Sequence, residues 1–296
     1  MVVGYAILKQ AGLSDRSNMR NCVTAPKRNI TQGTIFSGVR SPYDVGSVCY
    51  GICITARCDT ARDFKAPALT FLSVVTMDSW LWVEMLQKAI LDQRKAALGA
   101  LKKYLVEKKG TSIILDAFGP DKGFLEAEPA DKGMKKQSEL YKEASLAEKL
   151  SPFEWKKIPK SIAKRITTEA NQLLLGKMQD FYFIEDVEGV RGGAQVSQNL
   201  GFVVLLRDIR TISRDLALLV ADGIDSQQFD NLKNNDQTIH QLALNEDGFL
   251  CPVGELKSPF IEQLLQNFSI LFGRVGTKEV PSLYSERIQT LLGSQD

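Results

Sequence analysis

The side chains best suited to chemistry stand together directly after an apolar run: Arg57, Cys58, Asp59, Arg62 and Asp63. In such a cluster an arginine can stabilise phosphoryl charge and an aspartate can act as a base. A nearby arginine can also lower the pKa of a thiol and make the thiol reactive. The alternative is a turn in which the arginines and aspartates pair with one another. Arg57, Cys58 and Asp59 are the candidate catalytic residues, and all five are candidate binding residues.

Histidine is scarce in this chain, and its scarcity weakens a catalytic interpretation. The only histidine, His240, follows a polar stretch and is expected at the surface. Ser-His-Asp and Cys-His mechanisms need an imidazole close to the nucleophile. The sequence therefore argues against most common hydrolase mechanisms and leans towards a protein that is not an enzyme.

The cysteines at positions 49, 53 and 58 invite comparison with a zinc site. On one strand, Cys49 and Cys53 would point to the same face roughly 13 Å apart, which is too far to bind one ion. Cys22 and Cys251 lack partners at ligand spacing. We therefore expect buried, reduced cysteines, with no metal and no cofactor.

A second candidate surface is basic and has Phe153 and Trp155 beside it. Its members are Lys156, Lys157, Lys160, Lys164 and Arg165. Basic residues next to aromatic rings can hold a nucleic-acid backbone. The alternative is the solvated start of a helix, since the charge of the whole chain is nearly balanced.

Composition places the chain among ordinary globular proteins. It has 296 residues, of which 44% are hydrophobic and 24% charged, and its net charge is +2. This charge creates no global field that would draw the protein to nucleic acid or to a membrane. No apolar run approaches the roughly 20 residues of a membrane span, and the first residues do not read as a signal peptide. We expect a cytoplasmic protein with no membrane partner.

The elements that must position these residues alternate between β-rich and helical regions. Strands are expected at Ile35-Phe36, Val48 to Thr55, Leu69 to Val75 and Phe181 to Ile184, and again from Leu200 to Leu206. Helical spacing begins near Trp80 and ends at Gly110. Gly119 to Lys136 reads as an exposed loop, and Ser258-Pro259 as the start of a helix.

The helical content lies between β segments that are far apart in the sequence, and no Gly-rich phosphate loop is present. The predicted fold is α+β: a small SH3-like β-barrel elaborated by inserted and C-terminal helices. Residues 1–28 are expected to form an N-terminal arm and residues 29–296 a single domain. Within it, barrel strands fall in about 29–77 and 180–220, a helical insertion in about 79–178, and C-terminal helices in about 256–293.

Two pieces of the chain resemble a family of uncharacterised cytoplasmic bacterial proteins. One is Thr31-Gln-Gly-Thr-Ile-Phe with the later Ile-Thr-Ala-Arg-Cys-Asp, where the family has Gln-Gly-Asp-Ile-Phe and a Thr-Gln-x-Cys-Asp-Leu strand end. The other is Leu-Lys-Ser-Pro-Phe with Phe-Gly-Arg-Val-Gly near the C-terminus. The resemblance implies a place in mobile or defence-associated gene islands and names no activity.

A more distant similarity is to the SH3-like barrel of MazF/PemK-type endoribonuclease toxins. Gly33 to Phe36, the strand ending near Thr55, and Leu69 to Thr76 would match its opening strands. The toxins carry a catalytic Arg-Pro pair where this chain has Ser47-Val48-Cys49. The resemblance therefore implies the barrel without the nuclease chemistry.

These observations favour an intracellular protein-interaction module. The resemblance implies that it belongs to a bacterial defence system against phage or mobile elements, with a protein partner encoded nearby. One alternative is a toxin-type ribonuclease that uses Thr55, Arg57, Asp59 and Arg62. The other is a nucleic-acid-binding protein that uses the basic surface.

Overall fold

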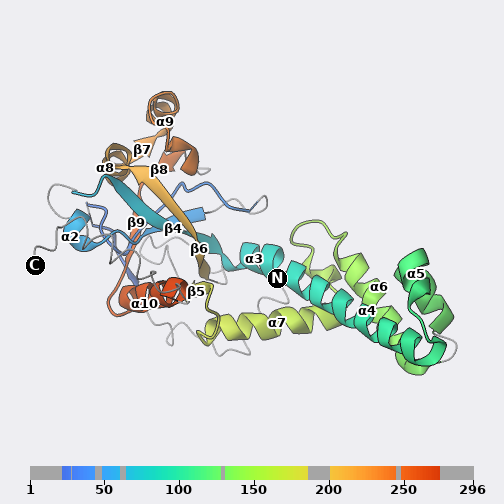
Figure 1. Ribbon diagram of the computed structural model, residues 1–296. Coiled ribbons are helices and arrows are strands. Elements are labelled where there is room, and N and C mark those ends of the chain that lie inside the picture. The colour runs from blue at the N-terminus through green and yellow to red at the C-terminus, as the bar shows by residue number, and fades with distance from the viewer. Residues whose placement is uncertain are drawn as a thin grey trace, which may run out of the picture.

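The computed structural model describes residues 22–27, 29–43, 49–60, 65–127, 131–185, 201–244 and 248–273. It is a mixed α and β structure built on a strongly curled antiparallel sheet that closes about half of a barrel. A set of helices projects away from this sheet (Figure 1). The predicted mixture of α and β structure is confirmed at this level.

Seven strands form the main sheet, in the order β1-β9-β2-β3-β4-β6-β5. Their bounds are β1 Val23–Thr24, β2 Thr34–Phe36, β3 Cys49–Cys53, β4 Ala68–Thr76, β5 Phe181–Ile184, β6 Phe202–Ser213 and β9 Pro252–Leu256. All their pairings are antiparallel. A separate small pair consists of β7 (Ile224–Asp225) and β8 (Phe249–Leu250).

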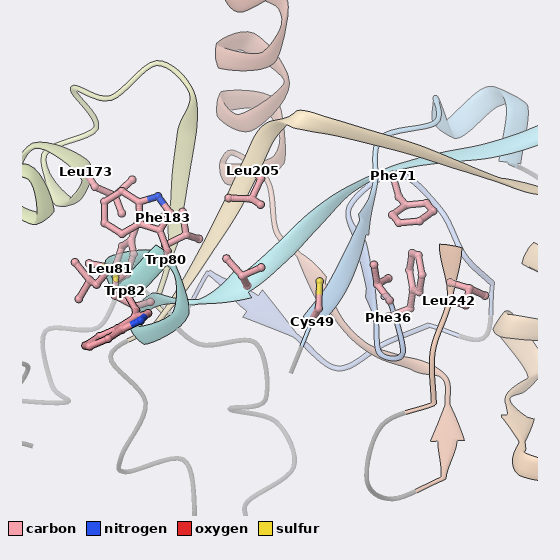
Figure 2. Packing of buried hydrophobic residues seen from close by; sticks show 14 of the residues in the cluster. Phe36, Cys49, Phe71, Trp80, Leu81, Trp82, Leu173, Phe183, Leu205 and Leu242 are labelled. Atoms are coloured by element: carbon pink, nitrogen blue, oxygen red, sulfur yellow. The ribbon is translucent and has the colours of Figure 1, made fainter. Parts of the chain in front are cut away.

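Both faces of the sheet are covered, so alternate residues of each strand enter different cores. Ile52 and Leu72 lie on the face that packs against α10 (Phe260–Gly273). Phe36 and Phe71 lie on the other face, with their ring centroids 5.2 Å apart (Figure 2). This second core continues to α8 (Arg214–Asp222) and to the 3-10 turn η5 (Ile239–Gln241). Helix α9 (Ser226–Leu232) lies beyond α8.

One continuous helical stretch leaves the end of β4. It comprises α3 (Met77–Trp80), the π-helical segment η2 (Leu81–Leu86) and α4 (Gln87–Lys109). Trp80 and Trp82 anchor its start in the core of the sheet (Figure 2). Its end is the predicted glycine, Gly110, whose φ of 73° is the left-handed conformation of a helix C-cap.

Three more helices complete the part that we call the helical projection, residues 87–174. They are α5 (Ile113–Ala127), α6 (Lys132–Ala147) and α7 (Lys160–Leu174), with the 3-10 turn η3 (Trp155–Lys157) before α7. Buried Gln93 of α4 ties the helices together, because its Nε2 donates to Leu140 O (2.9 Å) on α6 and to Ser161 Oγ (3.1 Å) on α7.

Several local expectations were wrong. Gly119 to Lys136 is not a loop: Gly119 only kinks α5, which continues to Ala127, and α6 begins at Lys132. The Gly/Pro/Lys composition hid apolar Phe124, which packs into the projection. β9 was also missed, because a five-residue strand containing Pro and Gly carries a weak pattern. Pro259 precedes α10 rather than opening it. The short helix α2 (Arg57–Thr60) was not expected either.

The expected N-terminal arm, residues 1–28, lies outside the described residues except for 22–27, which supply β1. Residues 274–296, including the end of the predicted C-terminal helices, also lie outside them. Within the described part of the chain, no helix is both long enough and apolar enough to cross a membrane.

Candidate functional site

The turn before β2 fixes where the first candidate surface begins. The backbone N–H of Thr34 donates to Thr31 O at 2.9 Å, and Gly33 takes a φ of 95°. A Cβ at Gly33 would lie 3.1 Å from the carbonyl oxygen of Leu256, so both conformation and space require glycine here. Gly33 N also donates to Cys53 O at 2.8 Å. The turn at Thr31 to Thr34 therefore joins the end of β3 to the start of β2.

Thr55 then ends the pairing of β3 with β4. Its hydroxyl accepts a hydrogen bond from Thr70 N at 2.7 Å and donates to Thr70 O at 3.3 Å. The Thr55 hydroxyl thus takes the hydrogen bonds that a strand backbone would make with Thr70. The backbone after Thr55 is no longer paired in the sheet. The freed chain turns into α2, whose buried Thr60 donates to Arg57 O at 3.3 Å.

Helix α2 presents the first three predicted residues to solvent. Arg57, Cys58 and Asp59 are all exposed. Cys58 Sγ lies 3.6 Å from Asp59 Oδ1. Arg57 forms no ion pair with a carboxylate of the described residues. Arg62 and Asp63 lie outside the described residues. The predicted cluster is therefore an exposed polar rim at the end of β3.

No described base contacts Cys58 other than the neighbouring Asp59 carboxylate. His240 is exposed, as predicted, with Nδ1 2.5 Å from Gln237 O and Nε2 2.8 Å from Gln241 Nε2. A nucleophile activated by imidazole needs the two side chains within hydrogen-bond reach. Among the residues the structure describes, the rim does not assemble such a pair.

The cysteines of β3 are unsuited to chemistry. Cys49 and Cys53 are buried in the core, and burial raises the pKa of each thiol to about 12. Both remain protonated at neutral pH, and a protonated thiol is neither a good nucleophile nor a metal ligand. The interpretation of these residues as small apolar side chains is confirmed.

The second predicted surface follows η3 and α7. Ile162 and Ile166 of α7 are buried with Ala170 and Leu173 in the core that α7 shares with η2, α4 and β5, so the basic residues lie on its outer side. Lys156, Lys157, Lys160, Lys164 and Arg165 are all exposed. Lys157 pairs with Glu154 at 2.5 Å, whereas the other four make no ion pair with any described carboxylate. The structure thus brings four uncompensated cations onto one stretch of surface.

A strained aromatic residue lies next to these cations. Glu154 N donates to Ser151 O at 3.2 Å, closing a turn in which Phe153 has a φ of 64°. The left-handed conformation costs a residue with a side chain roughly 1–2 kcal/mol. The Glu154 carboxylate holds the turn by accepting from Ser151 N at 3.0 Å, and its hydrogen bond from Lys157 lowers its pKa.

The ring of Phe153 rests on two tryptophans and remains partly open to solvent. Its centroid lies 5.8 Å from that of Trp82 and 6.4 Å from that of Trp155, and the two indoles meet edge to face at 5.0 Å. Phe153 is 39% exposed. The packing fixes the ring in place while the residue remains partly exposed to solvent.

A third polar group was not predicted from the sequence. Between Leu72 and Val74 the pairing partner in β6 shifts from Ile209 to Val204, so β6 bulges. Such bulges redirect side chains. This one places Asp208 against Arg210 at 2.9 Å, and Arg210 also donates to Arg40 O at 2.7 Å.

Beside this pair, Tyr43 OH donates to Glu84 Oε1 at 3.2 Å. Burial, and then the nearby Glu84 carboxylate, raises the pKa of Tyr43. These side chains thus bond to one another and to the main chain of Arg40, with two carboxylates facing a single guanidinium, and the bonds indicate a structural role. Residues 43, 84 and 208 are far apart in the sequence, so no local pattern could have found them.

The predicted surfaces are separate: α2 lies at one end of the sheet and α7 in the projection (Figure 1). The chain matches no protein-family model, and no curated protein or solved structure shows significant similarity to it.

Proposed function

We propose that this chain is a non-catalytic interaction protein that binds a protein partner through the far end of its helical projection. The observation that carries the proposal is the exposure of three large apolar side chains on α5. Ile113 is 67%, Phe118 61% and Leu125 66% exposed. Helix α5 lies at the end of the projection away from the sheet (Figure 1).

The same helix has a well-packed side, so its exposed residues are not a sign of poor packing. Phe124 and Ala127 are buried with Leu101 and Leu105 of α4. A Cβ at Gly123 would come within 3.1 Å of Leu101 Cδ2, which shows how closely the two helices approach. Large apolar side chains exposed on a packed helix can serve as anchors in a protein–protein contact.

Charge indicates the chemistry of the partner. The projection, residues 87–174, contains 18 lysines and arginines against 12 aspartates and glutamates, a net charge of +6. The rest of the chain contains 19 against 23, a net charge of −4. Lys122 Nζ lies 3.9 Å from the centre of the Phe118 ring, so positive charge borders the apolar residues. The partner that fits is a protein with an apolar groove in an acidic surface.

Nucleic acid fits this end of the projection less well. Ile113 and Leu125 are aliphatic and offer no flat ring for base stacking, the contact through which single strands gain much of their affinity. The ring of Phe118 already carries Lys122 Nζ over its face, 3.9 Å from its centre. Aliphatic anchors beside lysines suit an amphipathic protein groove.

Two further points support the proposal without being part of the site. The antiparallel order and curl of the sheet are compatible with the predicted SH3-like barrel, a scaffold that serves many binding proteins. The resemblance of the two chain ends to bacterial defence-associated proteins supports a cytoplasmic setting with the partner encoded nearby.

The test uses the full chain and the separately purified products of its neighbouring genes, with binding followed by calorimetry. We expect Leu125→Asp to weaken binding more than tenfold, because loss of a hot-spot anchor costs about 2 kcal/mol or more. Leu146→Asp is the matched control, since Leu146 of α6 is 63% exposed and lies outside α5. Equal losses in the two variants would contradict the proposal.

Catalysis is tested separately. Incubation of the purified chain with total RNA under several metal ions should yield no cleavage. Cleavage that disappears in Arg57→Ala and Asp59→Ala variants would contradict the non-catalytic interaction protein and support the toxin-type ribonuclease.

A further inference from the structure

The surface of α7 carries a feature that a protein-binding tip does not explain. Lys160 and Lys164 are one helical turn apart, about 6 Å along the axis, and Arg165 follows directly. Lys156 stands just before them in η3. As noted above, none of the four is paired with a carboxylate of the described residues. Exposed, uncompensated cations in a row present positive charge to an extended anion.

Phe153 adds a flat ring to this row. It lies three residues before Lys156, so the two Cα atoms are at most about 11 Å apart. A phenylalanine is held here in a left-handed conformation that glycine would adopt without strain. Strain of this kind clusters at binding sites, where the surrounding structure maintains it. Trp82 and Trp155 supply that support from below the ring.

From these contacts we infer that this surface binds single-stranded nucleic acid. The phosphates contact Lys156, Lys160, Lys164 and Arg165, and one base stacks on the exposed part of Phe153. A cationic groove or row with an aromatic platform is the usual means of binding single strands without regard to sequence. The net charge of +6 on the projection strengthens the local field, while the negative remainder of the chain keeps the nucleic acid on this side.

Single strands fit better than duplexes or acidic peptides. A duplex keeps its bases stacked on one another and cannot offer a face to Phe153. An acidic peptide would use the lysines but has no need of a rigid exposed ring. The inference is independent of the proposed protein partner, since the two surfaces share no residue.

The experiment measures binding of the full chain to a fluorescent oligothymidine of about 16 nucleotides by anisotropy, between 50 mM and 200 mM salt. We expect the logarithm of affinity to fall with the logarithm of salt with a slope of roughly −3, as four phosphate contacts predict. Binding should also quench tryptophan fluorescence, because Trp155 and Trp82 support the ring on which the base stacks.

Charge variants locate the site. Lys160→Glu with Lys164→Glu should weaken binding at least tenfold and make the salt slope shallower. Lys102→Glu with Lys108→Glu is the matched control, because it changes the net charge equally on exposed positions of α4. An equal loss in both double variants, or no binding at the lowest salt, would overturn the inference.

Ring variants separate stacking from folding. Phe153→Ala should weaken binding about tenfold, within the range found for loss of one stacked base. Phe153→Trp should retain wild-type affinity, since it restores a flat ring. Wild-type affinity in Phe153→Ala, weak binding in Phe153→Trp, or equal affinity of the wild type for a duplex of the same length would contradict the stacking role. Failure of the α5 variants to alter protein binding would leave these results unaffected.

Discussion

At the scale of single residues, burial divides the cysteines of β3 and α2 into two kinds. Cys49 and Cys53 are sealed in the core with their pKa raised to about 12, whereas Cys58 lies on the exposed helix α2. Reaction with an alkylating reagent needs both thiolate and access. Cys58 should therefore react much faster than Cys49 and Cys53, although Cys49 and Cys58 are only nine positions apart in the sequence.

Brief treatment of the folded protein with iodoacetamide at pH 8 tests this difference. We expect Cys58 to be modified, and Cys49 and Cys53 to react only after denaturation. Peptide mass spectrometry with and without denaturant gives the extent at each site. Equal labelling of Cys53 and Cys58 in the folded protein would contradict the burial of β3.

The same residues show how far the sequence could predict the site. The abrupt change from apolar to charged residues after Thr55 correctly predicted that Arg57 to Asp59 are exposed at a strand end. The left-handed conformation of Phe153 could not be predicted, since phenylalanine has no preference for it. Nor could the Asp208–Arg210 pair, because a bulge in β6 creates it.

At the scale of elements, two glycines illustrate opposite demands on space. A Cβ on Gly51 of β3 would lie 2.4 Å from the Cζ atom of Phe36, so the ring can cover the strand only because the side chain is absent. Gly99 lies within α4, where an added Cβ meets nothing within 4 Å. The first glycine is required by packing, and the second only lowers helix propensity.

We expect Gly51→Ala to lower the free energy of unfolding by about 1–3 kcal/mol through overpacking. Gly99→Ala should raise it by about 0.5–1 kcal/mol, because alanine favours the helix. Urea denaturation of both variants measures the two effects. Destabilisation of similar size at both positions would indicate that α4 does not have the open surface seen at Gly99.

Elements were predictable where one pattern dominated. The long helix ending at Gly110 and the central strand β3 have clear periodicity or continuous apolar character. The second half of helix α5, from Gly119 on, was missed because its stabilisation comes from contact of Phe124 with α4, a tertiary effect that overrides its Gly and Pro content. Strand β9 was missed because its pairing with β1 and β2 joins distant segments.

At the scale of the whole molecule, a partly buried carboxylate lies where the long helical stretch leaves the sheet. Asp78 stands in the first turn of α3, directly after β4, and burial raises its pKa. The folded protein therefore holds the proton more tightly than the unfolded chain does. Its contribution to stability is fully present below the ordinary aspartate pKa and is lost as the pH rises through the raised value.

Asp78→Asn should remove this loss. We expect the variant to resemble the wild type in stability at acidic pH and to exceed it at neutral pH, as measured by urea unfolding across that interval. Asp92→Asn, on the exposed side of α4, is the control for loss of one charge from the same helical stretch. A similar pH trend in the control would show that burial of Asp78 is not the cause.

The π-helical segment Leu81–Leu86 has a consequence for how the projection is aimed. Each residue of an α-helix advances the direction of side chains by about 100°. A π-helical turn holds about one residue more than an α-helical turn. A one-residue deletion in this segment would therefore restore regular α-helical bonding with every later position at nearly the same angle, and α4 would keep its contacts with α6. The same deletion within α4 would turn all later positions by about 100°. The direction in which α5 and α7 face is thus tolerant of a lost residue only in the six residues beside the sheet.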